Sequence, residues 1–211
     1  MPVPRPARPA LILAILLSSA VAAYAADTSG IPRFQKVSNT LYRGAQPSDQ
    51  SYPELAKLGV TTVLDLRRPE EHSTSGEAKL VESAGMHYVN VPMTGWETPT
   101  ATQIGQVRAV MDTGGVVFVH CKQGRDRTGT VTALYRIEHE GWANDRAYSE
   151  ARKNGLRWYF SGLNNLIKGY KADPAIAAKY ASAATPAVVL TATADSSAAS
   201  AAAASASSQE Q

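Results

Sequence analysis

The sequence has a single cysteine, Cys121, among 211 residues. One thiol cannot form a disulfide within the chain, and it excludes a cysteine-rich zinc site. The histidines His72, His87 and His139 show no spacing typical of metal ligands. The sequence therefore predicts neither a metal nor another cofactor.

The sequence also has little net charge. Lys and Arg number 21 against 18 for Asp and Glu, which is a formal net charge of +3. Arg5 and Arg8 lie in an N-terminal segment that we expect to be removed, and its removal lowers the net charge to +1. Such a balance offers no electrostatic basis for nucleic-acid binding, so we expect no nucleic-acid partner.

Long apolar runs are scarce. The clearest is "ALILAILLSSAVAA" at 10–23, which is shorter than the roughly 20 residues that a membrane-spanning helix needs. Arg5 and Arg8 precede this run and the small residues "AYA" end it, a pattern typical of a secretory signal. We predict a signal peptide at 1–25, export to the periplasm or secretion, and no stable membrane span after cleavage. An uncleaved anchor is the alternative.

The C-terminal stretch 181–211 is dominated by Ala, Ser and Thr and has little charge. This composition predicts a disordered low-complexity tail. Residues 26–180 are left as one domain, long enough to bury a core.

Within this domain, runs typical of strands alternate with helical patterns. Strands are predicted at 60–66, 86–92 and 115–121, the first and last apolar enough to be buried on both faces. Helices are predicted at 51–59, 75–85, 100–112, 127–141, 145–153 and 162–171. The alternation predicts an α/β fold with a mostly parallel central sheet of about four to five strands flanked by helices.

Cys121 lies where the last buried strand ends, and the loop "CKQGRDR" leads from it into a helix. In α/β sheets, ligands bind beyond the carboxyl ends of the strands. Backbone N–H groups of such a loop, beside a helix N-terminus, form an anion site, and Gly124 and Gly129 allow a close backbone approach. A thiol in this field can have a pKa of about 3.5 to 7.5 instead of about 8.5. Cys121 is therefore predicted to be an activated nucleophile.

Three neighbours of Cys121 extend this hypothesis. Arg127 can return across the loop and donate two hydrogen bonds to the oxyanion that Cys121 attacks. Thr128 can place its hydroxyl near the sulfur, and His120 can brace the loop through backbone hydrogen bonds. A buried structural cysteine is the alternative interpretation.

The segment "HCKQGRDRTG" resembles the H-C-x5-R-T signature of the cysteine-dependent phosphatases, the protein-tyrosine and dual-specificity superfamily. The resemblance continues in "LYRGAQPS" and "LAKLGVTTVLDLR", which are similar to the N-terminal half of small dual-specificity phosphatases of plants, fungi and bacteria. It covers residues 34–171 and implies the compact phosphatase fold, with 26–180 as a catalytic domain.

The resemblance also implies a mechanism. Cys121 would form a phosphocysteine intermediate, Arg127 would bind the phosphoryl oxygens, and water would hydrolyse the intermediate without a metal. The phosphate-binding residues would be Lys122, Gln123, Gly124, Arg125, Asp126 and Arg127.

Two residues are candidates for the general acid, which the family usually takes from an Asp on an upstream loop. The corresponding "VPMTGWETPT" has no Asp, and its one carboxylate is Glu97. Asp126, in the position of an Asp thought to be the acid of myotubularin-like phosphatases, is the second candidate. The competing interpretations are a solvated Glu97 and an Asp126 that orients Arg125 or Arg127.

The substrate is equally open. Lys122 and Arg125 add positive charge beyond the need of one phosphoryl group, which favours a phosphoinositide or inositol phosphate as an alternative to a phosphoprotein. Trp96 and Tyr159 are candidates for the walls of a phosphotyrosine slot. A phosphate-binding module without turnover is a second alternative. A rhodanese-like sulfur transferase is disfavoured by Arg127 and the "RTG" that opens the helix.

Overall fold

The computed structural model describes residues 28, 30–71, 74–176 and 178. The strands are β1 (Gln35–Lys36), β2 (Leu41–Ala45), β3 (Val60–Asp65), β4 (His87–Asn90) and β5 (Val116–Cys121). The α-helices are α1 (Tyr52–Lys57), α2 (Thr74–Ser83), α3 (Ala101–Met111), α4 (Asp126–Glu140), α5 (Asn144–Lys153) and α6 (Ser161–Gly169). Two short 3₁₀ turns, η1 (Asp49–Ser51) and η2 (Pro69–Glu71), precede α1 and α2.

The strands form one sheet in the order β1-β2-β5-β3-β4. β2, β5, β3 and β4 are parallel, and β1 pairs antiparallel with β2 at the edge. The predicted α/β fold with a mostly parallel sheet is therefore confirmed. β5 is the central strand, so Cys121 is delivered to the middle of the edge at which the parallel strands end.

Strand β2 was not predicted, because Arg43 and Gly44 interrupt its apolar pattern. Both residues are nonetheless buried in the structure. A Cβ on Gly44 would lie 2.7 Å from Ile31 Cγ2 and 3.1 Å from the Phe118 ring, so the strand needs glycine to pack there.

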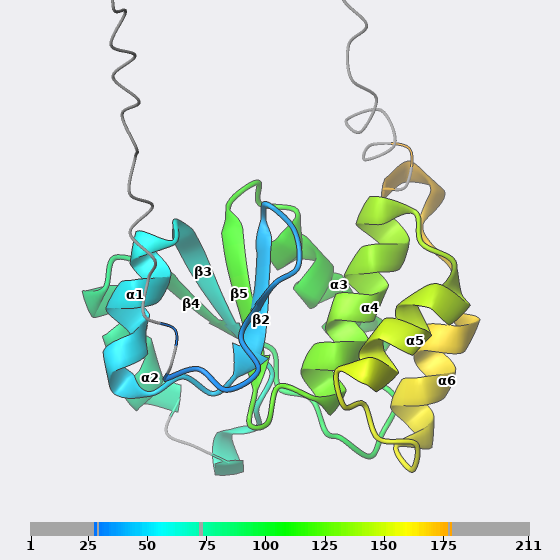
Figure 1. Cartoon of the computed structure of the whole chain (residues 1–211), viewed down its shortest axis with the longest axis horizontal. Coiled ribbons are helices and arrows are strands. Elements are labelled where there is room, and N and C mark those ends of the chain that lie inside the picture. The colour runs from blue at the N-terminus through cyan, green and yellow to red at the C-terminus, as the bar shows by residue number, and fades with distance from the viewer. Residues whose placement is uncertain (1–27, 29, 72–73, 177, 179–211) are drawn as a thin grey trace, which may run out of the picture.

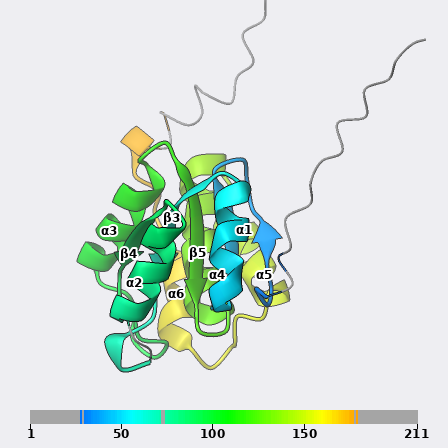
Figure 2. The same ribbon diagram turned by 90° about the vertical axis from the view of Figure 1, so that its left-hand side faces the viewer.

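Helices cover both faces of the sheet. α1 and α2 lie on one face and α3 to α6 on the other (Figure 1), and Figure 2 shows α1 and α2 in front of the sheet. Because side chains alternate along a strand, Val119 and Cys121 of β5 pack toward α3 and α4. Phe118 packs in the other core with α1 and α2, and His120 stacks on the Phe118 ring. The thiol and the imidazole next to it thus belong to opposite faces.

Helix α4 is buried on most sides between the sheet and α5 and α6. It begins at Asp126, one residue before the predicted start, and Gly141 ends it in the left-handed conformation (φ 65°), which favours glycine. The other predicted helices are found with boundaries shifted by one or two residues.

The predicted signal peptide at 1–25 and the predicted tail at 181–211 both lie outside the described residues. Within the described part of the chain, no helix is both long and apolar enough to cross a membrane.

Candidate active site

The loop that follows Cys121 is held against strand β2. Cys121 is only 2% exposed, and the buried Arg43 of β2 donates a 2.6 Å hydrogen bond from Nη2 to the Gly124 carbonyl. Gly124 has φ +64°, and a Cβ there would lie 2.5 to 2.6 Å from the backbone of Gly44 and Ala45. Burial lowers the pKa of the Arg43 guanidinium to about 10, and the electrostatic interaction with Cys121 offsets only part of this decrease. Arg43 is therefore a buried cation that supports the loop, and its role was not predicted from the sequence.

Arg127 lies in the first turn of α4 and is held by four hydrogen bonds. Nη1 donates to Glu71 Oε2 at 2.6 Å and to the carbonyls of Leu66 and Met93 at 3.2 and 3.1 Å. Nη2 donates to Glu71 Oε1 at 2.9 Å. The guanidinium is thus fixed in orientation at the cavity that Cys121 also lines.

Glu71, at the end of η2, is a site residue that the sequence analysis missed. The hydrogen bonds from Arg127 are the main reason that the pKa of Glu71 falls to about 2. No local pattern could reveal this pair, because 56 residues separate its members. Their contact depends on how η2 packs against the start of α4.

We expect Glu71→Gln to lower kcat/KM roughly 10- to 100-fold, because a charge-assisted pair becomes a neutral contact and Arg127 loses its fixed orientation. Glu71→Asp should recover part of the activity. Glu70→Gln is the matched control, since Glu70 is the exposed neighbour on the same turn. Steady-state kinetics on p-nitrophenyl phosphate measure the effect, and wild-type rates for Glu71→Gln would contradict the positioning role.

The Asp126 carboxylate pairs with Arg157, and not with Arg125 or Arg127. Oδ1 accepts from the Arg157 backbone N at 2.9 Å, and Oδ2 accepts from Arg157 Nη2 at 2.7 Å and Nε at 3.1 Å. Arg157 belongs to the α5–α6 connection, so Asp126 ties that connection to the start of α4. Arg125 packs against Gly155, in the same connection.

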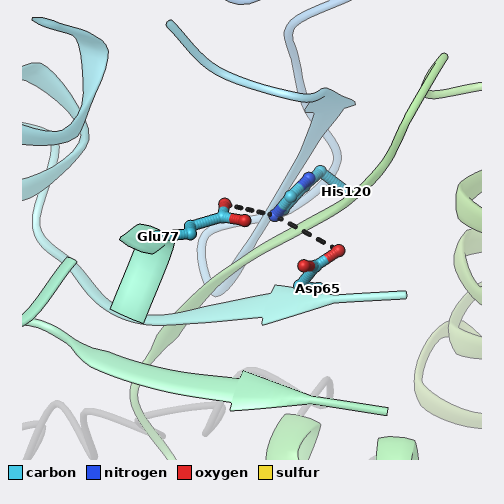
Figure 3. Close-up of side chains that lie close together, drawn as sticks. All are labelled: Asp65, Glu77 and His120. Carbon is cyan, nitrogen blue, oxygen red and sulfur yellow. Dashed lines mark ion pairs between the residues drawn. The ribbon is translucent and has the colours of Figure 1, made fainter. Parts of the chain in front are cut away.

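His120 and Thr128 are both fully buried. The Thr128 hydroxyl makes no hydrogen bond within the described residues. His120 Nε2 lies 3.1 Å from Glu77 Oε1 of α2 and 3.8 Å from Asp65 Oδ1 of β3 (Figure 3). Arg67 donates to both carboxylates. The side chain of His120 therefore belongs to a buried polar network on the face of the sheet that α1 and α2 cover.

Asp65, Glu77 and His120 place three possible ligand atoms within 4.8 Å of one another, which suits a metal ion. The guanidinium of Arg67 already supplies positive charge to both carboxylates, including two hydrogen bonds to Asp65 at 2.9 and 3.0 Å. A cation would have to displace Arg67, which is itself buried. We therefore describe this cluster as a structural network.

Burial lowers the pKa of His120 from 6.5 to about 4. Since the folded state binds the proton less well than the unfolded state, stability is complete above pH 6.5 and falls as the pH drops toward 4. We expect His120→Asn to flatten this part of the profile of unfolding free energy against pH. His87→Asn, at an exposed histidine, is the control, and an unchanged slope in His120→Asn would refute the assignment.

The side chains around Cys121 enclose a cavity of about 360 Å³. Lys122, Gln123, Asp126 and Arg127 of the loop line it, whereas Gly124, Arg125 and Thr128 are absent from its lining. Glu97 also lines the cavity and accepts a 3.3 Å hydrogen bond from Thr94. Trp96, Tyr159 and Phe160 form an aromatic wall, with Trp96 and Phe160 ring centroids 4.7 Å apart. Both aromatic candidates and both acid candidates thus share one cavity with Cys121.

A family model described as a DSP-PTPase phosphatase of polymorphic toxin systems matches residues 37–141. The dual specificity protein phosphatase TpbA of Pseudomonas aeruginosa (strain UCBPP-PA14) is 33% identical over 122 residues, which cover 57% of this chain and 54% of TpbA. This chain belongs to the cysteine-dependent, dual-specificity-like phosphatase family. It spans about half the length of the curated TpbA.

Other members of the phosphatase family match as well. The inositol diphosphatase DSP3 of Arabidopsis thaliana is 26% identical over 138 residues, covering 62% of this chain and 66% of DSP3. The crystal structure of P. aeruginosa TpbA in complex with pTyr superposes with a TM-score of 0.57 at 26% identity, covering 78% of this chain and 98% of that structure. The family resemblance and the compact phosphatase fold expected from the sequence are confirmed.

Proposed function

We propose that the chain is a phosphatase that hydrolyses phosphomonoesters through a phosphocysteine intermediate, acting as a dual-specificity or tyrosine phosphatase. One observation carries the proposal: Cys121 and Arg127, six residues apart, line the same cavity, with the guanidinium held in place by Glu71. A phosphoryl group in that cavity meets a nucleophile and a bidentate donor together.

The chemistry follows from this arrangement. The Cys121 thiolate attacks phosphorus while the bond to the leaving oxygen breaks, and a carboxylic acid transfers its proton to that oxygen. The resulting carboxylate then takes a proton from water, whose oxygen attacks phosphorus and breaks the P–S bond. Inorganic phosphate leaves and the thiolate is restored. Arg127 and the backbone N–H groups of the loop stabilise the charge on the equatorial oxygens in both steps.

We assign the general acid to Glu97 and a positioning role to Asp126. Both carboxylate oxygens of Asp126 are engaged by Arg157, so proton donation would require that pair to open. Glu97 is exposed, lines the same cavity as Cys121, and accepts a hydrogen bond from Thr94 on one of its oxygens. Its other oxygen can therefore approach a leaving group.

Leaving groups of different basicity separate these roles. We expect Glu97→Gln to lower kcat on an alkyl phosphate about 10²-fold and to change p-nitrophenyl phosphate little, because p-nitrophenolate leaves without a proton. Asp126→Asn should lower both rates alike, since it loosens the loop. Full turnover of the alkyl phosphate by both variants would remove both assignments.

The cavity also bears on the substrate. Its wall of Trp96, Tyr159 and Phe160 suits an aromatic phosphomonoester, and the related TpbA has been crystallised with pTyr. Arg125, one of the two cations that favoured a polyphosphorylated ring, packs against Gly155 and does not line the cavity. We therefore favour a phosphotyrosine-type substrate over an inositol phosphate, although DSP3 is described as an inositol diphosphatase.

Phosphate release from phosphopeptides, phosphoinositides and soluble inositol phosphates tests the proposal directly. The highest kcat/KM is expected on phosphotyrosine peptides. A preference for inositol pyrophosphates would replace the substrate assignment, and no release from any compound would leave only a phosphate-binding module.

We also propose that the protein is exported, on the strength of Arg5, Arg8 and the apolar run at 10–23. Sequencing the N-terminus of the protein recovered from the periplasm or medium should give Ala26 as the first residue. Retention of Met1 in a cytoplasmic fraction would contradict export.

A further inference from the structure

Three neighbouring aromatic side chains, two of which line the cavity, are strongly exposed. The exposed fractions are 72% for Trp96, 74% for Trp158 and 42% for Tyr159. They touch one another: the centroids of Trp96 and Tyr159 lie 6.2 Å apart, and those of Trp158 and Tyr159 lie 5.8 Å apart. We call Trp96, Trp158 and Tyr159 the aromatic rim. Large apolar groups clustered on a surface mark an interaction site.

Trp158 shows that the rim does more than enclose a substrate. Trp96 and Tyr159 line the cavity, but Trp158 does not. A phosphomonoester bound at Cys121 therefore explains two of the three exposed rings and leaves the most exposed one without a role. A partner outside the cavity would account for its exposure.

Cations accompany the rim. Arg68 and Lys122 are exposed at the cavity, and the Arg157 guanidinium lies 5.2 Å from the Tyr159 ring centroid. Asp126 and Glu71 are already paired with Arg157 and Arg127. Arg68 Nε also lies 3.7 Å from Glu71 Oε2. The charged residues that line the cavity are four cations (Arg68, Lys122, Arg127 and Arg157) and three acids (Glu71, Glu97 and Asp126), which leaves an excess of one positive charge.

The rim lies on one edge of the molecule. In Figures 1 and 2, the α5–α6 connection (yellow), which carries Trp158 and Tyr159, reaches the same lower edge as η2. The cavity opens at this edge, because its lining includes Arg68 and Glu71 together with Tyr159. A flat partner that contacts the rim would therefore cover the cavity mouth.

We propose that the aromatic rim docks this edge on an anionic lipid surface, with the cavity facing the membrane. Trp and Tyr prefer the boundary between headgroups and acyl chains, where the ring is buried and the polar atom stays wet. Arg68 and Lys122 are attracted by anionic headgroups. The inference rests on the proposed function only in that the covered cavity is the catalytic one. It implies that the substrate's phosphate is presented at a membrane.

Tryptophan fluorescence can report on Trp158 alone, because the chain has only three tryptophans. In the full chain with Cys121→Ser, Trp96→Phe and Trp142→Phe leave Trp158 as reporter, whereas Trp96→Phe and Trp158→Phe leave Trp142. Trp142 follows α4 and lies about 20 Å from the cavity by helix length, so it serves as the control. The apolar run at 10–23 contains no tryptophan and is common to both variants.

Both variants are mixed with phosphatidylglycerol–phosphatidylcholine vesicles that carry a headgroup-level quencher. Trp158 is expected to be quenched and shifted to the blue, and Trp142 to be unchanged. Trp158→Ala should weaken partitioning about tenfold, and Arg68→Gln about fivefold. No quenching of Trp158, equal quenching of Trp142, or equal partitioning to vesicles without phosphatidylglycerol overturns the proposal.

A peptide partner gives a different result. If Trp158→Ala lowers kcat/KM on phosphopeptides tenfold and leaves vesicle partitioning unchanged, the rim docks peptides and the membrane proposal is overturned. Trp158→Ala is expected to hydrolyse soluble p-nitrophenyl phosphate at the wild-type rate. This result would separate membrane docking from the proposed phosphatase activity. A chain that binds vesicles but releases no phosphate refutes only the proposed function.

Discussion

Cys121→Ser is expected to abolish phosphate release, lowering kcat by more than about 10³-fold, since loss of a nucleophile removes the covalent pathway as a unit. Ser is nearly isosteric with Cys, so the loop should remain able to bind phosphate. Release from p-nitrophenyl phosphate measures the first effect, and the rise in Tm with added phosphate or vanadate measures the second.

Arg127→Lys is the companion variant. Lysine keeps the charge but cannot donate a bidentate pair, so we expect a loss of about 10²- to 10³-fold in kcat. In contrast to Cys121→Ser, this variant should retain slow turnover.

If Cys121→Ser keeps measurable activity above background, the thiol is not the nucleophile and the proposed mechanism is wrong.

Gly124→Ala is expected to damage the site nearly as severely without touching a reacting group. A new Cβ would lie 2.5 to 2.6 Å from the backbone of Gly44 and Ala45, where no flexible side chain can move aside. The φ of +64° adds about 1 to 2 kcal/mol of strain for a residue with a Cβ. The loop must then leave strand β2 and the hydrogen bond from Arg43. A displacement of about 1 Å can lower catalysis about 10²-fold.

The matched control is Gly105→Ala in α3, where a Cβ meets nothing within 4 Å. Alanine there should raise stability by up to about 1 kcal/mol, because glycine is a poor helix former. Thermal melts and kinetics on p-nitrophenyl phosphate should show a lower Tm and kcat for Gly124→Ala only. Equal behaviour of the two variants would show that the loop does not depend on its packing against β2.

Together these variants distinguish the reacting groups from the residues that hold them. Arg43 and Gly124 fasten the loop to β2, Glu71 orients Arg127, and Asp126 joins the loop to the α5–α6 connection. Each of these contacts links segments far apart in the chain. The proposed phosphate site is thus assembled by tertiary packing around a short local motif.

Much of the fold was predictable, because strongly patterned segments form what their pattern indicates. The apolar run at 115–121 is the central strand β5, and the glycine at 141 ends α4 as expected. Strand β2 was not predicted because two of its residues serve tertiary contacts. Arg43 binds the Gly124 carbonyl of the loop, and Gly44 leaves room for the Phe118 ring.

The amino-acid sequence by itself predicted Cys121 as the nucleophile, Arg127 as its phosphate-binding partner and the order of the strands and helices from residue 51 onward, because a strand, a seven-residue loop and a helix are local and their chemistry lies within ten residues. Only the tertiary structure decided what surrounds them. It paired Asp126 with Arg157 and Arg127 with Glu71, left Arg125 outside the cavity lining, and brought Trp96, Trp158 and Tyr159 into contact beside the cavity. These contacts depend on which side chains the fold brings together from distant parts of the chain. The spacing of residues along the sequence does not specify such pairs.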